Sequence, residues 1–117
     1  MNLPDLNHYL KKTELIRQTA EQIIKDFDLF GLEIAFSGSP ENAYDELLNQ
    51  IQPCIINLLK HNQQKFYGLL YRIDLSEEQI DQSVKKNKEK EFSLIISDLI
   101  VKRELQKIVI RNYYKGK

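Results

Sequence analysis

FSLIISDLIVKRELQKIVIRNYY, residues 92–114, is the stretch around which we expect this chain to fold. Apolar residues occupy nearly every side of its first half when it is drawn as a helix. Its second half keeps one apolar stripe and gains basic residues. The stretch therefore predicts one long, largely buried C-terminal helix against which the other helices pack.

This predicted helix has two different sides. One is a continuous apolar stripe, formed by Leu94, Val101, Leu105 and Ile108. The opposite side starts apolar and continues as basic residues at four-residue steps, in the order Phe92, Ile96, Leu99, Ile100, Arg103, Lys107 and Arg111. We expect the first side to anchor the fold. The second side carries more apolar surface than one side of a small bundle needs, and such an excess favours a binding partner.

The 117 residues have the size of one domain, and 42% apolar with 29% charged residues is a globular composition. Few Gly and Pro favour helices over disorder or a loop-rich sandwich. The formal charge is zero, but residues 1–52 hold nine acids and four bases, whereas residues 53–117 hold eight acids and thirteen bases. This asymmetry suits head-to-tail packing of two copies, a basic end that meets an anionic partner, or merely solvated helix faces.

No apolar run reaches the roughly 18 residues that span a bilayer, and the start MNLPDL lacks the features of a secretory signal. We therefore expect a cytoplasmic protein without a membrane partner. Its single cysteine, Cys54, lies in an apolar helical pattern, which indicates a reduced, buried side chain.

Two helices are expected before residue 60, preceded by a shorter segment. Residues 1–12 are expected to form a short helix or docking arm behind Pro4. Thr13 is the expected N-cap of a longer helix that Gly31 ends. Residues 32–36 alternate like a strand but have no partner strand, so we expect an extended segment laid over the bundle. Ser39 and Pro40 then start a helix along residues 40–59. Pro53 predicts a kink or break near residues 49–52.

The second half of the chain carries the sharpest local signal. A shorter helix is expected around Phe66–Ile73. Ser76 and Gln79 then form a capping box inside the staple positions Leu75 and Ile80, so a new helix begins there. Residues 85–91 are expected to be an exposed loop. Altogether the sequence predicts a single all-α domain, residues 1–117, built as a bundle of about five helices.

Residues 69–84 have the layout of a helix-turn-helix, a motif that can read DNA. Asp74 stands where glycine is usual, however, and the acids Glu77, Glu78 and Asp81 would face phosphates. A second candidate for nucleic-acid binding is a basic surface with two aromatic residues, made of Lys102, Arg103, Lys107, Arg111, Tyr113 and Tyr114. An ordinary capped helix corner explains the first pattern as well. The favourable placement of Lys and Arg near a helix C-terminus explains the second.

Catalytic, cofactor and metal sites have little support in the sequence. Cys54 and His61 are about 10 Å apart along a helix, too far to hold one metal ion alone. There is no phosphate-binding glycine loop and no nucleophile motif. Asp98 is the acid that we expect to be partly buried, paired with Lys102 one turn on or linked to Arg72.

The preferred function is a non-catalytic scaffold or adaptor without cofactor or metal, which binds another protein or itself through helix faces. A homodimer is the simplest assembly. The expected interface residues are Phe92, Ile96, Leu99, Ile100 and Arg103. The alternative function is nucleic-acid binding by the basic C-terminal surface.

Overall fold

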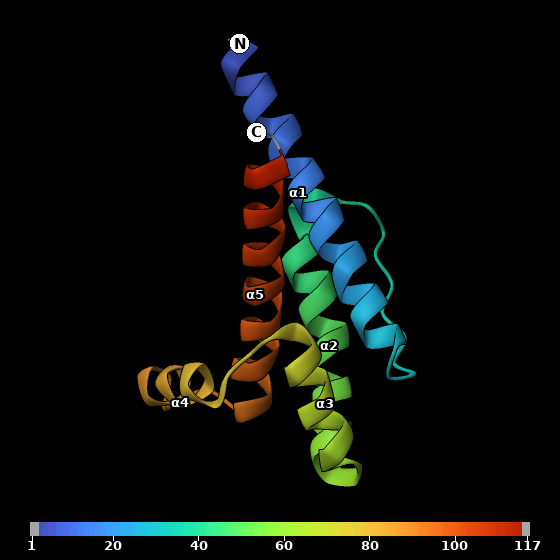
Figure 1. Cartoon of the computed structure of the whole chain (residues 1–117), viewed down its shortest axis with the longest axis vertical. Coiled ribbons are helices and arrows are strands. Elements are labelled where there is room, and N and C mark those ends of the chain that lie inside the picture. The colour runs from blue at the N-terminus through green and yellow to red at the C-terminus, as the bar shows by residue number, and fades with distance from the viewer. Residues whose placement is uncertain (1–2, 116–117) are drawn as a thin grey trace.

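The computed structural model describes the backbone of residues 3–115 and the side chains of residues 12–115. This part of the chain is all-α, as predicted, and contains no strand. Figure 1 shows its elements in order: α1 (Leu3–Asp28), the 3₁₀ turn η1 (Pro40–Asn42), α2 (Ala43–His61), α3 (Gln63–Ile73), α4 (Glu77–Lys86) and α5 (Phe92–Lys115).

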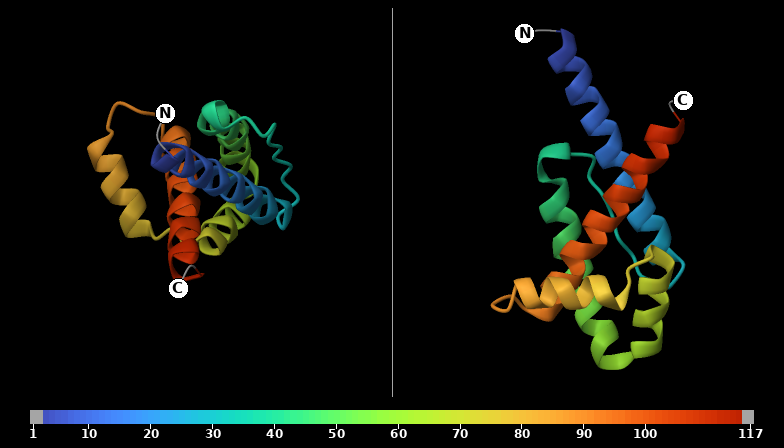
Figure 2. Two further views of the ribbon diagram at one scale, coloured as in Figure 1. Left: turned by 90° about the horizontal axis from the view of Figure 1, so that it is seen from above. Right: turned by 60° about the vertical axis from the view of Figure 1, so that its left-hand side comes forward.

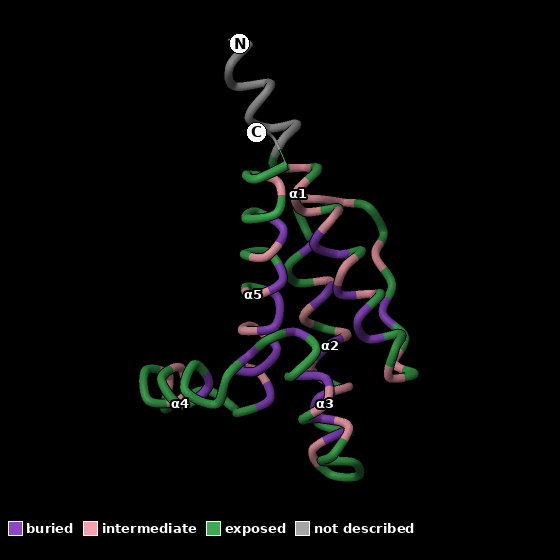
Figure 3. The backbone as a smooth tube through the Cα atoms, viewed as in Figure 1, coloured by how far each residue is buried: buried purple, intermediate pink, exposed green. Residues whose placement is uncertain are grey.

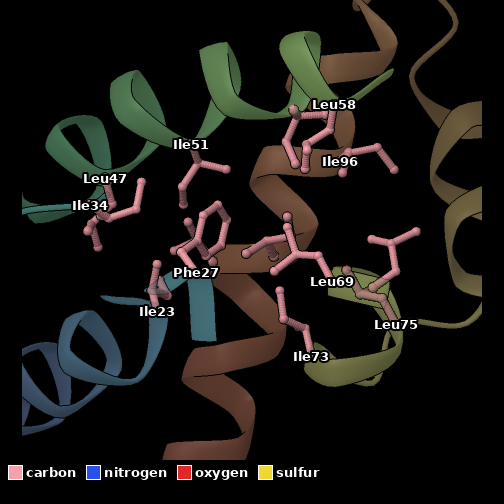
Figure 4. Packing of buried hydrophobic residues seen from close by; sticks show 14 of the residues in the cluster. Ile23, Phe27, Ile34, Leu47, Ile51, Leu58, Leu69, Ile73, Leu75 and Ile96 are labelled. Carbon is pink, nitrogen blue, oxygen red and sulfur yellow. The ribbon is translucent and has the colours of Figure 1, made fainter. Parts of the chain in front are cut away.

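The C-terminal helix α5 is the centre of the fold, as the sequence predicts. It contacts each of the other four α-helices. In Figure 2, α1 crosses α5, α2 lies against it, and α4 stands out from the bundle beside the start of α5. The core that these contacts enclose is shown in Figure 4; its labelled members come from α1, α2, α3, α5 and two connecting segments: Ile23, Phe27, Ile34, Leu47, Ile51, Leu58, Leu69, Ile73, Leu75 and Ile96.

The N-terminal helix α1 is longer than predicted. Its backbone is continuous from Leu3 to Asp28, so Thr13 lies inside a helix and is not an N-cap, and residues 3–12 are not a separate helix. Helical spacing explains the continuity, because residues 6, 10, 13, 16 and 20 follow one another at steps of four, three, three and four. The expected docking arm therefore merges into α1, with residues 1–2 and the side chains of residues 1–11 outside the described part.

The extended segment after α1 is confirmed, and side chains of α2 hold it in place. Gly31 ends the helix region in the left-handed conformation, with φ of 72°. The Gln50 side chain then acts as a substitute for a neighbouring strand: its amide oxygen accepts from the Ala35 N–H at 2.9 Å, and its amide nitrogen donates to the Ala35 carbonyl at 2.7 Å. Glu46 accepts from both the backbone N–H and the hydroxyl of Ser37. Two polar side chains thus supply the hydrogen bonds that a sheet would otherwise provide.

Helix α2 begins differently from the prediction and is not broken at Pro53. Pro40 takes the first position of η1, as expected, but the Ser39 side chain makes no capping hydrogen bond. Pro53 does not break the helix, which runs from Ala43 to His61. The proline ring removes the donor for the carbonyl of Asn49, and both residues are exposed, so water can reach that carbonyl.

The corners around α3 and α4 are confirmed closely. The expected helix around Phe66–Ile73 is α3, whose buried residues are Phe66, Leu69, Leu70 and Ile73. Helix α4 starts with the predicted capping box of Ser76 and Gln79. Asp74 ends α3 in the left-handed conformation, with φ of 69° and ψ of 50°. Aspartate therefore takes the conformation for which glycine is the usual residue at this turn. The loop between α4 and α5 covers residues 87–91, within the predicted segment.

Candidate functional site

The predicted interface on α5 is largely covered inside the chain. Ile96 and Ile100 are fully buried, Leu99 is half-buried, and Phe92 is 43% exposed. In this fold Ile96 and Ile100 cannot touch a partner, so the expected interface is wrong at its two central residues. Arg103 is not free for a partner either, because its guanidinium donates to the backbone carbonyl of Asp74 at 3.0 Å and to its carboxylate at 2.7 Å.

The side of α5 that faces the core is neither of the two predicted sides. Its buried face is a row at helical spacing that includes three polar residues: Ser93, Ile96, Ser97, Ile100, Glu104 and Ile108. The predicted anchoring stripe is only partly inside, since Val101 and Ile108 are buried whereas Leu105 is 39% exposed. Because Ser97 and Glu104 face the core, a stripe chosen for apolar residues alone gives the wrong orientation.

Four basic residues of α5 are engaged within the chain. Lys102 pairs with Asp98 at 2.8 Å, Arg103 with Asp74 at 2.7 Å, and Lys107 with Glu104 at 2.6 Å. A phosphate would have to compete with a carboxylate at each of these residues. Arg111 donates to the amide oxygen of Gln22 on α1 at 3.2 Å, which ties it to the neighbouring helix.

Tyr113 and Tyr114 are 58% and 70% exposed, and their rings meet edge to face with centroids 5.3 Å apart. They follow each other in the helix, so their side chains leave it about 100° apart. The two rings are therefore not arranged side by side as a flat stacking platform for bases.

The largest apolar exposure lies on the C-terminal half of α5. Leu105, Val109 and Tyr113 recur every four residues and are 39%, 44% and 58% exposed, and Ile110 beside them is 46% exposed. Gln106 lies between them, so this side of the helix carries no charge over more than two turns. We call these five residues the uncharged face. Figure 3 shows the change along α5, from mostly buried near its start to largely exposed near its end.

An apolar hollow adjoins the uncharged face. Its volume is about 170 Å³, and α1, η1, α2 and α5 all contribute to its lining: Ile16, Thr19, Pro40, Glu41, Ala43, Tyr44, Leu47, Val101 and Leu105. Beyond Leu105, α5 runs away from α2 and lies beside α1, as Figure 2 shows. Asn112 donates to the amide oxygen of Gln18 at 2.8 Å, which fixes that pairing. The hollow and the uncharged face thus form one apolar surface where α5 leaves α2.

Two carboxyl groups meet in the core, which the sequence did not reveal. Asp26 of α1 is 1% exposed and Glu104 of α5 is fully buried. One oxygen of Asp26 accepts from Gln22 at 3.0 Å and from Arg72 of α3 at 3.1 Å, and Lys107 lies 2.6 Å from one oxygen of Glu104. Among the described residues, the second oxygen of Asp26 and both oxygens of Glu104 have no hydrogen-bond partner, so Lys107 contacts Glu104 as an ion pair only. A proton on Glu104, donated to Asp26, supplies the missing hydrogen bond.

The protonation of this pair follows from its surroundings. Burial and, after it, the adjacent Asp26 together raise the pKa of Glu104 to about 8 against the opposing effect of Lys107. Burial also tends to raise the pKa of Asp26, but hydrogen bonds from Glu104, Arg72 and Gln22 outweigh it and lower that pKa. Near neutral pH, therefore, Asp26 is ionised and Glu104 holds the shared proton.

Asp98 is partly buried, as expected, but only one of its two expected partners is present. Lys102 pairs with it, and the hydroxyl of Tyr44 on α2 donates to it. Arg72 instead binds Asp26, so the predicted Asp98–Arg72 link is wrong. Burial and the hydrogen bond to Asp98 raise the pKa of Tyr44 to about 12.

The remaining chemistry is limited. In the part of the chain that the structure describes, no three His, Cys, Asp or Glu side chains gather as a metal site would require. Cys54 is half-buried, and burial raises the pKa of its thiol, which favours the unreactive protonated form. None of the helices in the described region is long and apolar enough to cross a membrane.

Comparisons with known proteins add no relative. No protein-family model, curated protein or solved structure matches this chain significantly. The function of the chain is therefore inferred from the geometry of its fold.

Proposed function

We propose that this protein is a non-catalytic helical module that binds proteins, and that it associates with a second copy of itself through the uncharged face of α5. One observation carries the proposal: Leu105, Val109, Ile110 and Tyr113 are 39–58% exposed on one side of one helix. An exposed apolar patch of this kind is a common mark of a protein–protein contact.

The chemistry of the face supports a second copy as the partner. Charged residues make up 29% of the chain, yet none lies on this face, and interface cores are depleted in charge in the same way. When two identical faces meet about a twofold axis, like charges would oppose each other; the five residues of this face carry none, and the nearest guanidinium, that of Arg103, donates to Gln106 at 2.7 Å while it pairs with Asp74. The adjoining hollow beside Leu105 gives a partner side chain a place to pack.

The experiment compares two charge insertions at exposed apolar positions. Val109→Lys changes the uncharged face, whereas Leu29→Lys is a matched control at the far end of α1, where Leu29 is 61% exposed. Sedimentation equilibrium should show a dimer for the wild type and for Leu29→Lys. Val109→Lys should associate at least tenfold more weakly than the wild type, because a buried unpaired charge costs a few kcal/mol. A wild type that stays monomeric at millimolar concentration would refute self-association.

Nucleic-acid binding through the basic residues of α5 is the alternative, and their ion pairs weigh against it. Single-stranded and duplex oligonucleotides at two salt concentrations test it with the same protein. Binding to phosphates weakens steeply as salt rises, whereas apolar association does not.

A further inference from the structure

A second hollow lies along the first half of α5 and shares Tyr44 with the hollow beside Leu105. It has a volume of about 430 Å³ and opens where the end of α4 and the α4–α5 loop meet α5 and the start of α2. Figure 2 shows α4 and the α4–α5 loop lying outside the start of α5. We call it the lysine groove. Its volume falls in the range of roughly 300–1,000 Å³ that small-molecule sites occupy.

The floor of the lysine groove is apolar. Leu48 of α2 and Leu94 and Leu99 of α5 line it and are half-buried, so part of each side chain faces the groove. Ile95, which is 5% exposed, closes the floor. Covering these side chains with hydrocarbon would remove apolar surface from water, which is favourable.

The rim of the groove is positively charged. Lys86, Lys90 and Lys102 line it, and Asp98 is its one acid. Lys102 and the hydroxyl of Tyr44 already bind Asp98, so this carboxylate needs no added cation. Within the described residues, Lys86 and Lys90 form no ion pair. Three bases against one acid leave a net charge of +2, which favours an anion.

We propose that the lysine groove binds a small amphiphilic anion, that is, a carboxylate, sulfate or phosphate group on a hydrocarbon chain. The anionic group lies between Lys86 and Lys90, and the hydrocarbon covers the leucine floor. The two parts of the ligand thus match the two parts of the groove. This inference does not depend on self-association, because the uncharged face begins at Leu105, beyond the groove residues of α5.

Titration calorimetry with dodecanoate, kept below its micelle concentration, tests the ligand class. Acetate carries the same head without the hydrocarbon, and dodecyltrimethylammonium carries the hydrocarbon with the opposite charge. Dodecanoate should bind and the other two should not. Decanoate should bind about tenfold more weakly than dodecanoate, since each buried methylene contributes about 0.8 kcal/mol. Equal binding of the cationic chain would overturn the proposal.

Paired lysine variants test the location. Lys86→Gln with Lys90→Gln removes two charges from the groove, whereas Lys85→Gln with Lys88→Gln removes two from the same segment outside it. The first pair should weaken dodecanoate binding at least tenfold, and the second pair should change it less than threefold. Equal weakening by both pairs would overturn the proposed site. Loss of binding in Val109→Lys would do the same, by placing the hydrocarbon on the uncharged face.

Discussion

The buried carboxyl pair makes stability depend on pH in a direction that is opposite to that of most acids. The folded protein keeps a proton on Glu104 up to about pH 8, whereas the unfolded chain releases it near the ordinary glutamate pKa of 4.5. Between these values the folded state binds more protons than the unfolded state. Raising the pH therefore destabilises the folded state in this window. The pKa of Asp26 is lowered in the folded state, so its contribution to stability has the opposite dependence on pH. That contribution is lost only in acid, as the pH falls below the ordinary aspartate pKa of 3.8.

The magnitude follows from the shift. One proton of difference changes the free energy of unfolding by about 1.4 kcal/mol per pH unit. Because the unfolded chain is already partly ionised at pH 5 and the folded protein half ionised at pH 8, the contribution of Glu104 should fall by about 3–4 kcal/mol between these values, which corresponds to roughly 15 °C in melting temperature for a domain of this size.

Glu104→Gln should remove this dependence. Its amide group is uncharged at every pH, can donate to Asp26 through its nitrogen and can accept from Lys107 through its oxygen. Urea unfolding followed by circular dichroism at pH 5, 6, 7 and 8, at constant ionic strength, measures the effect. The difference between the variant and the wild type should grow in favour of the variant as pH rises. Glu89→Gln, at an exposed loop position, is the control and should follow the wild type. Parallel profiles for Glu104→Gln and the wild type would refute the shared proton.

Four further substitutions test the core, an exposed position, the cap of α4 and the proline inside α2. Ile96→Ala should cost about 2–5 kcal/mol in urea unfolding because it leaves a cavity in the core, whereas Ile56→Ala, at a position of α2 that is 37% exposed and outside the uncharged face, should cost under about 1 kcal/mol. Ser76→Ala removes the capping box and should cost about 1 kcal/mol, with faster amide hydrogen exchange in the first turn of α4. Pro53→Ala should raise the melting temperature, because it restores a donor for the carbonyl of Asn49 at a gain of about 1–2 kcal/mol.

Local signals in the sequence were sufficient to predict most of the helices. The capping box at Ser76 and the stop at Gly31 involve neighbouring residues only, and both predictions are confirmed. Thr13 failed as a cap because a residue that suits a helix start is also tolerated within a helix when its neighbours continue the pattern. Pro53 failed as a break because its cost depends on whether water reaches Asn49, which sequence alone does not show.

The orientation of α5 was harder to predict, because it depends on partners from other helices. Glu104 occupies the third place in the row of residues 96, 100, 104 and 108, whose other members are isoleucines that face the core. An acid inside such a row is a signal for a buried carboxyl group. It becomes decisive only once Asp26 of α1 is known to meet it. The uncharged face could be found only after the buried face had been fixed.

The proton on Glu104 also changes the charge of the molecule. Counting side chains gives 17 bases and 17 acids and hence a neutral chain, but that count assigns a negative charge to Glu104. With Glu104 neutral near pH 7, 16 ionised acids remain, and the folded protein carries a net charge of +1. Folding at neutral pH therefore takes up about one proton from the buffer. The native molecule is isoelectric at a higher pH than its own denatured chain.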